Sequence, residues 1–215
     1  MAVTSTRLSI FPLAGALLFP RALLPLHIFE PRYRAMVADS LARDRRIGMI
    51  QPRTEAAPGD PRPALFDVGC VGRVAEVEAL PDGRYNLVLE GIGRFRVRRE
   101  LDVATAFRQV EAEVGGFGDE AATPPLALIL RAELEREARR YARAKGYEID
   151  WEQVTRLDDE SLVNGIAQVA PFDVAAKQAL LEAPAIADRA DLLVQFLRFF
   201  RLDDDSDGDE GATLQ

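Results

Sequence analysis

Prolines interrupt the most apolar stretch of this chain, residues 11–34 (FPLAGALLFPRALLPLHIFEPRYR), and this pattern constrains the fold more than any other feature. The stretch is apolar enough to resemble a membrane anchor, but Pro12, Pro20, Pro25 and Pro31 divide it into short pieces. Proline lacks the backbone N–H and interrupts the hydrogen bonding of helices and sheets. The stretch therefore predicts short buried strands joined by tight turns. A helix follows from Pro31, because the first helical position needs no N–H.

The composition of the 215 residues favours a soluble globular protein, since 48% of them are hydrophobic and 29% are charged. Cys70 is the single cysteine, which excludes an intrachain disulfide and fits a reducing compartment. A transmembrane helix needs a run of about 18 apolar residues, and the chain has no uninterrupted run of that length. The prolines and Arg21 also argue against a signal peptide. We therefore expect a cytoplasmic protein that does not bind membranes.

Acidic residues concentrate near the C-terminus, between Asp203 and Glu210, and supply most of the net charge of -8. A segment so acidic and so poor in apolar side chains buries too little surface to offset the entropy lost on ordering. We therefore expect residues 203–215 to be a disordered acidic tail. A solvating appendage is favoured over a docking site for a basic partner.

The N-terminal half predicts a β sheet with one inserted helix. The expected strands are residues 7–13, 23–29, 46–51, 68–80, 85–97, 101–103 and 109–114. Apolar residues at helical spacing over residues 31–42 predict the helix. Pro81-Asp82-Gly83 predicts the turn of a hairpin, and Gly91 and Gly93 predict a bulge or bend in its second strand. These segments indicate a closed or strongly curved sheet of about six strands.

Helical periodicity replaces strand alternation after residues 115–123. The expected helices are residues 124–145, 161–170, 174–181 and 185–202. In the first of them Ile129 and Leu134 are expected on the buried stripe. The predicted class is therefore α+β, with a β-barrel subdomain over residues 1–118 and an α-helical bundle over residues 119–202.

Two groups of short motifs have the order and spacing of a known family. The first is LFP-x(3)-LPLHIFEPRY at residues 18–33, and the second is the series DVG-x-VGRV, LPDGRY and LEGIGRFRV within residues 67–97. Each motif is weak alone, but their order and spacing together are specific. Over about residues 8–201 the chain resembles the N-terminal substrate-binding domain of Lon proteases, which also occurs in cereblon and as a freestanding protein.

The resemblance implies a fold and a function. It implies a β barrel of the pseudouridine-synthase-and-archaeosine-transglycosylase (PUA-like) type with one inserted helix, followed by an α-helical bundle. In Lon this domain helps to recruit unfolded or degron-bearing polypeptides. The resemblance therefore implies a peptide-binding module in protein quality control, with such polypeptides as partners and a protease or chaperone as a further one.

The sequence lacks the motifs of Lon's ATPase and protease domains. A P-loop needs Gly-Lys followed by Ser or Thr, but the only lysines are Lys145, which precedes Gly146, and Lys177. No protease motif surrounds any serine. His27, the only histidine, is expected to be structural, and no Cys/His cluster could hold a metal. We therefore expect a bacterial, freestanding, non-enzymatic form of the domain without cofactor or metal.

Polypeptide binding needs exposed apolar surface or an open sheet edge. The concave junction between barrel and bundle is the natural place for it in this architecture. The candidate residues for polypeptide binding are Phe19, Leu23, Phe29, Tyr33, Phe66 and Phe117. For each of them, ordinary burial in a core is the alternative. Tyr147 and Trp151 would either anchor a partner or pack between the two parts.

Nucleic-acid binding is the alternative function. Arg94, Arg96 and Arg98 alternate along one strand and are expected to share a face, which Arg99 extends. Such a cationic face could contact phosphates. A solvated strand face is the simpler interpretation, because arginine is abundant throughout the chain and the acidic tail opposes phosphate attraction. Nucleic acid is therefore the less favoured partner.

Overall fold

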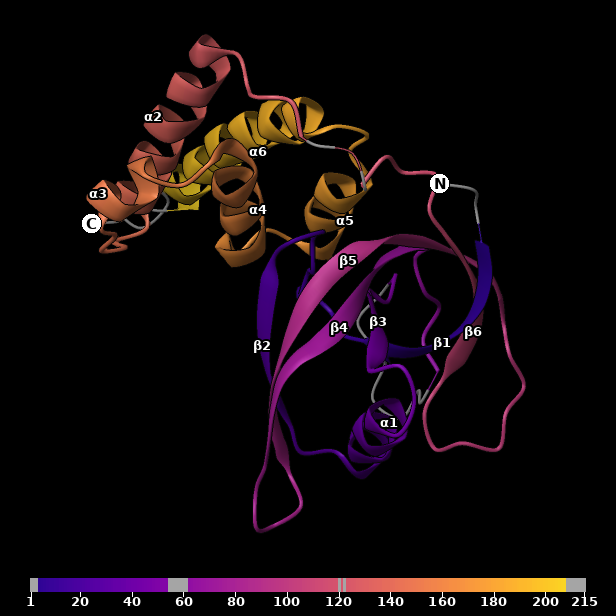
Figure 1. The fold of residues 1–215 in the computed structure, drawn as a ribbon. Coiled ribbons are helices and arrows are strands. Elements are labelled where there is room, and N and C mark those ends of the chain that lie inside the picture. Colours follow the sequence, from indigo (N-terminus) through magenta and orange to yellow (C-terminus); the bar gives the residue numbers. More distant parts are fainter. Residues whose placement is uncertain (1–3, 54–61, 120, 122, 208–215) are drawn as a thin grey trace. The chain divides into compact units, whose positions relative to one another are not determined.

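A computed structural model describes residues 4–53, 62–119, 121 and 123–207 of the chain (Figure 1). The chain divides into two compact units, Met1–Ala122 and Thr123–Gln215, which we call the N-terminal unit and the helical unit. Within the described residues, all strands and one helix belong to the first unit, and five helices belong to the second. The class is therefore α+β. In the described residues, no helix combines the length and hydrophobicity needed to cross a membrane.

The N-terminal unit is built on a mixed six-stranded sheet in the order β2-β5-β4-β3-β1-β6. Its strands are β1 (Thr4–Pro12), β2 (Leu23–Ile28), β3 (Arg46–Ile50), β4 (Val68–Ala79), β5 (Tyr85–Glu100) and β6 (Gln109–Val114). β1 and β3 are parallel, and the other neighbours are antiparallel. The helix α1 (Pro31–Leu41) is inserted between β2 and β3 and begins at Pro31, which confirms the prediction from the sequence.

The long strand β5 organises this sheet, because it pairs with β2, β4 and β6. The pairings run from β5 through β4, β3, β1 and β6 and then return to β5. Apolar side chains from these strands form one buried cluster: Leu8, Ile10, Ile50, Val71, Phe95, Val110 and Ala112. β2 lies outside this circuit beside the projecting β4–β5 hairpin (Figure 1), and among the described strands it pairs only with β5.

The structure confirms the hairpin and the bulge but not every predicted strand. Val71 pairs with Gly93 and Gly72 with Gly91, so Ile92 is the extra residue of the predicted bulge. Residues 101–103, expected as a strand, belong instead to the loop between β5 and β6. The amide of Leu101 donates to the carbonyl of Gln109 at 2.9 Å, which closes this loop.

The helical unit contains five helices among the residues that the structure describes. They are α2 (Leu128–Ala144), α3 (Trp151–Thr155), α4 (Asp159–Val169), α5 (Val174–Glu182) and α6 (Ile186–Asp207). α3 was not predicted, and the Asp150 carboxylate caps it by accepting from two backbone amides. α6 continues to Asp207, beyond the expected end at residue 202, and the remainder of the predicted tail lies outside the described residues.

The first turn of α2 differs from the sequence-based expectation. The helix begins four residues later than residue 124, and the amide of Leu126 donates to the Asp159 carboxylate at 2.7 Å instead of entering the helix. Ile129 is 82% exposed, so its predicted place on the buried stripe is wrong. Leu134, five residues further along, is fully buried as expected. The buried stripe of α2 therefore starts a turn later than the apolar pattern does.

A buried carboxylate links α2 to α6. Glu137 on α2 is 2% exposed and lies 3.1 Å from the guanidinium of Arg140 and 3.2 Å from that of Arg136. Arg198 and Arg201 approach it from α6 at 3.6 and 3.5 Å. Burial raises the pKa of Glu137, but the four arginines lower it by more, so this pKa lies below its ordinary value. The ionised carboxylate therefore stabilises the fold.

We predict that Glu137→Gln lowers the free energy of unfolding of the helical unit at neutral pH by about 1–3 kcal/mol. The folded pKa of Glu137 is depressed, so its contribution is present above the pKa of the unfolded chain and is lost as pH falls through the folded pKa. The free energy of unfolding of the variant should accordingly fall less steeply at acidic pH than that of the unaltered protein. Urea unfolding at several pH values measures this. Glu152→Gln, at an exposed position, is the control, and equal pH profiles would contradict the prediction.

Candidate functional site

The most exposed large apolar side chains of the N-terminal unit lie at the two ends of β2. Leu23 and Phe29 are each 60% exposed. They lie on the outer face of β2, β5 and β4, opposite to the side on which Leu87 and Leu89 are buried. We call this surface the β2 face. Its residues are Leu23, Pro25, His27, Arg73, Glu76, Glu78, Asn86, Val88 and Glu90, and Phe29 continues it beyond the strand.

The pairing register arranges the β2 face in three rows that cross the strands. The first row is Leu23, Glu90 and Arg73; the second is Pro25, Val88 and Glu76; the third is His27, Asn86 and Glu78. Directly paired residues of antiparallel strands point to the same side of the sheet. Each row therefore begins on β2 with an apolar or aromatic side chain and ends on β4 with a charged one.

A β bulge in β4 places the two glutamates on this face. Val74 pairs with Leu89, but Glu76 pairs with the next residue of β5, so Ala75 is the extra residue. Side chains alternate along a regular strand, and without the bulge Glu76 would point toward the buried side. A bulge redirects the side chains that follow it. Glu76 and Glu78 consequently lie on the β2 face, with Val77 on the opposite side.

Hydrogen bonds connect the third row. A guanidinium nitrogen of Arg84 lies 3.3 Å from Nε2 of His27. On the other side of the ring, Nδ1 of His27 lies 2.7 Å from Oδ1 of Asn86. Arginine only donates, so Nε2 accepts and Nδ1 carries the proton that His27 donates to Asn86. Asn86 then donates to Glu78 at 3.0 Å. Both ring nitrogens of His27 therefore have partners within this row.

Two arginines near the β2 face, Arg73 and Arg84, are paired with acids. Arg73 and Glu90 lie 2.5 Å apart, and Arg84 and Asp82 lie 2.6 Å apart. The backbone amide of Arg84 also donates to Asp82, which lowers the pKa of that carboxyl. These pairs cancel in charge, so Glu76 and Glu78 leave the face with an excess of negative charge.

The β2 face is hollowed and borders an unpaired edge. A hollow of about 520 Å³ is lined by residues of all three strands, including Pro25, His27, Glu76 and Val88. The edge of β2 away from β5 has no partner strand among the described residues. Pro25 lies within β2. Proline has no backbone N–H to donate, and an edge strand tolerates it because no neighbouring strand needs a hydrogen bond on that side. An extended polypeptide could lie on this face or along this edge.

The other candidates for polypeptide binding lie elsewhere. Phe19 is 0% exposed and belongs to the core, which leaves no surface for a ligand. Tyr33 is buried against Phe11, with ring centroids 4.3 Å apart, and burial raises the pKa of its hydroxyl. Phe66 and Phe117 are half-buried, and Phe66 lies under the guanidinium of Arg53. Of the six predicted residues, the structure brings only Leu23 and Phe29 onto one exposed surface.

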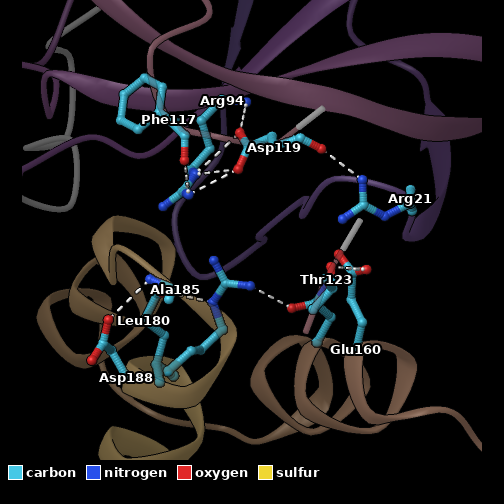
Figure 2. Close-up of polar contacts among 11 residues, drawn as sticks. Arg21, Arg94, Phe117, Asp119, Thr123, Glu160, Leu180, Ala185 and Asp188 are labelled. Carbon is cyan, nitrogen blue, oxygen red and sulfur yellow. Dashed lines mark hydrogen bonds and ion pairs between the residues drawn. The ribbon is translucent and has the colours of Figure 1, made fainter. Parts of the chain in front are cut away.

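Arg94 does not lie on a cationic strand face. It is 3% exposed, and Asp119 accepts hydrogen bonds from its backbone amide at 2.7 Å and from its guanidinium at 2.8 and 3.1 Å (Figure 2). Phe117 stacks on the same guanidinium, whose carbon lies 4.9 Å from the ring centroid. Arg21 donates to the carbonyl of Asp119 at 2.6 Å. Residues 117–119 thus cover Arg94, which the strand pattern alone could not show.

The other arginines of the proposed phosphate-binding face also differ from the expected alternation. A register shift between Val97 and Arg99 interrupts the pairing of β5 with β6. Arg98 forms an ion pair with Glu113, and Arg99 forms one with Glu111 at 2.7 Å. Arg96 lies over the ring of Phe117 at 5.7 Å. The carboxylates on β6 reduce the positive charge available to a phosphate, so this arrangement does not favour nucleic-acid binding.

The helical unit has an apolar hollow of its own, of about 580 Å³. Tyr147, Ile149, Trp151, Leu157 and Val169 are among its lining residues. The guanidinium of Arg139 lies 4.5 Å from the ring centroid of Trp151. Tyr147 and Trp151, both noted in the sequence, therefore line one surface. No group of His, Cys, Asp and Glu side chains in the described part of the chain could hold a metal ion.

Comparison with known proteins identifies the family. The model of the ATP-dependent protease La (LON) substrate-binding domain matches residues 7–198. The chain is 33% identical over 127 residues to Lon protease 2 of Sorangium cellulosum, covering 53% of this chain and 16% of that protein. It is 26% identical over 182 residues to Lon protease 2 of Thermus thermophilus, covering 83% of this chain and 22% of that protein. The chain thus spans no more than about a fifth of the length of these relatives.

Two solved structures share the fold. The Lon N-terminal domain protein of Xanthomonas campestris aligns with a TM-score of 0.62 and 22% identity, covering 89% of this chain and 98% of that one. The N-terminal domain of the Mycobacterium avium complex Lon protease aligns with a TM-score of 0.66 and 17% identity, covering 90% and 98%. The match from residue 7 to residue 198 takes in both compact units. This chain belongs to the family of Lon substrate-binding domains.

Proposed function

We propose that this chain is a non-catalytic recognition module that binds unfolded or degron-bearing polypeptides on the β2 face. The observation that carries the proposal is the exposure of Leu23 and Phe29 on a hollowed sheet face beside an unpaired strand edge. Membership of the substrate-binding family supports it. We further propose that the chain delivers such polypeptides to a protease or chaperone as an adaptor.

The proposal includes the finer description of the fold. We propose that the circuit of pairings from β5 back to β5 is the PUA-like barrel and that the helical unit is the bundle that follows it in this family. This arrangement leaves β2 outside the barrel, with exposed side chains on its outer face and no second partner strand among the described residues. Unfolded polypeptides expose apolar side chains and unpaired backbone groups, and the β2 face offers partners for both.

The first functional prediction concerns Leu23 and Phe29. The double variant Leu23→Ser/Phe29→Ser should weaken binding of a reduced, alkylated and permanently unfolded protein by about tenfold or more, because it removes two apolar contacts of the kind that dominate interfaces. Both side chains are exposed, so the fold should be unaffected. Fluorescence anisotropy with the labelled unfolded protein measures the affinity.

Ile129→Ser is the control, since it removes an apolar side chain from α2 that is even more exposed, at 82%. It should leave the affinity unchanged. Unaltered binding by the double variant would contradict the proposed site. Salt-sensitive binding of single-stranded RNA that Arg96→Ala and Arg99→Ala weaken, with no binding of unfolded protein, would favour the RNA-binding alternative instead.

A further inference from the structure

The second row of the β2 face combines an apolar surface with one carboxylate. Pro25 and Val88 lie side by side on β2 and β5, and Glu76 follows on β4. In the first row Arg73 neutralises Glu90, and in the third row Asn86 donates to Glu78. Glu76 is exposed, and no ion pair or hydrogen bond of its carboxylate occurs within the described residues. It is therefore the carboxylate on this face best placed to bind an incoming cation.

We propose that the β2 face selects polypeptide segments in which a lysine or arginine lies close to apolar residues, and that Glu76 binds the basic side chain. The inference rests on the proposed function, because it names the class of polypeptide that this face takes. Glu76 is assigned as a specificity-determining residue. Leu23 would bind the apolar neighbour on one side of the basic residue, and Phe29 would bind an apolar residue further along on the other side.

The dimensions of the row fit a long basic side chain. Pro25 and Glu76 are two strands apart, a distance of about 10 Å. The methylene stem of lysine or arginine packs on apolar surface while its charged end stays in water. A segment that lies along β2 can thus place the stem over Pro25 and Val88 and the charged end at Glu76.

The spacing of the β2 face also fits an extended segment. Leu23, Pro25, His27 and Phe29 follow each other at every second position, and side chains of an extended ligand repeat with the same period. A basic side chain over the second row would therefore have its neighbours two positions away over Leu23 and near His27. The third row is already bonded from Arg84 to Glu78, so it offers a fixed surface rather than a free charge.

Charge complementarity excludes acidic segments from the same place. The two arginines near the face are each paired with a carboxylate, and Glu78 adds a second negative charge beside Glu76. A glutamate in the ligand would meet this excess of negative charge without a cation to receive it. The bulge at Ala75 is the backbone feature that creates this selectivity, because it turns Glu76 toward the ligand.

Three extended peptides test the inference. They share one apolar and aromatic sequence and differ at a central position that holds lysine, norleucine or glutamate. Because an exposed ion pair contributes modestly, the lysine peptide should bind about two- to fivefold more tightly than the norleucine peptide. The glutamate peptide should bind most weakly. Glu76→Gln should remove the preference for lysine without changing the affinity for norleucine, and high salt should have the same effect.

Glu152→Gln is the matched control, because it removes the same charge from an exposed position in the helical unit. It should keep the preference for lysine. Glu76→Lys should reverse the order of the lysine and glutamate peptides. Equal affinities of the three peptides for the unaltered protein would overturn the inference and leave the proposed function standing. Failure of all three to bind, together with failure of the unfolded protein to bind, would overturn both.

Discussion

Replacing Asp119 by alanine is expected to lower the free energy of unfolding of the N-terminal unit by about 3–5 kcal/mol. The change leaves the guanidinium of Arg94 buried without its carboxylate, since Arg94 is only 3% exposed. It also removes the acceptor of the Arg94 backbone amide, which donates to Asp119 at 2.7 Å. A buried charge without a counter-charge cannot regain its hydration unless the surrounding structure opens. Urea unfolding followed by circular dichroism measures the loss.

Two further variants separate this effect from a general loss of charge. Glu111→Ala removes the partner of the exposed Arg99 and should cost no more than about 1 kcal/mol. The double variant Arg94→Met/Asp119→Leu removes both buried charges and should recover most of the stability lost by Asp119→Ala. If Asp119→Ala and Glu111→Ala lower the free energy of unfolding equally, the contact of Arg94 with Asp119 does not hold residues 117–119 in place.

Adding a single methyl group at residue 91 is expected to be as damaging. In Gly91→Ala the new Cβ would lie 1.9 Å from the carbonyl oxygen of Phe19, which is main chain and cannot rotate away. The backbone of Gly91 also bonds to residues 21 and 22, donating to Ala22 at 2.9 Å and accepting from Arg21 at 2.8 Å. Relief of the clash would break these bonds, so we expect a loss of about 3 kcal/mol or more.

Gly165→Ala provides the matched control for this substitution. Nothing lies within 4 Å of the Cβ position there, and Gly165 is in the interior of α4. Alanine favours helix over glycine, so this variant should gain up to about 1 kcal/mol. Thermal unfolding of both variants gives the comparison. An unchanged melting temperature for Gly91→Ala would show that the segment around Phe19 shifts freely.

The features of the fold that local chemistry determines could be predicted from the sequence. Pro31 predicted the start of α1, because proline suits the first helical turn. Pro81-Asp82-Gly83 predicted the turn between β4 and β5, and Gly91 and Gly93 predicted the bulge at Ile92. In each case the residue type itself restricts the backbone. The α+β class followed from the change of periodicity between the two halves.

Features that depend on contacts between distant residues could not be predicted. Alternation along β5 suggested an exposed face for Arg94, but it carries no information about the later segment that covers it. The bulge at Ala75 lacks a glycine to mark it, so the direction of Glu76 was not visible in the sequence. Leu23 and Phe29 could not be separated from Phe19, because all three are equally apolar and only tertiary packing decides which is buried.

The pairing of β1 with β6 matters while the chain is being synthesised. Among the described strands, residues Thr4 to Ser9 of β1 pair only with β6, and the contact between Ser5 and Glu111 spans 106 residues of sequence. At translation rates of about 5–20 residues per second, β1 leaves the ribosome roughly 5–20 s before β6 exists. During that time its edge is open to pairing with other chains. The last strand to be made therefore decides how long the first one stays vulnerable to aggregation.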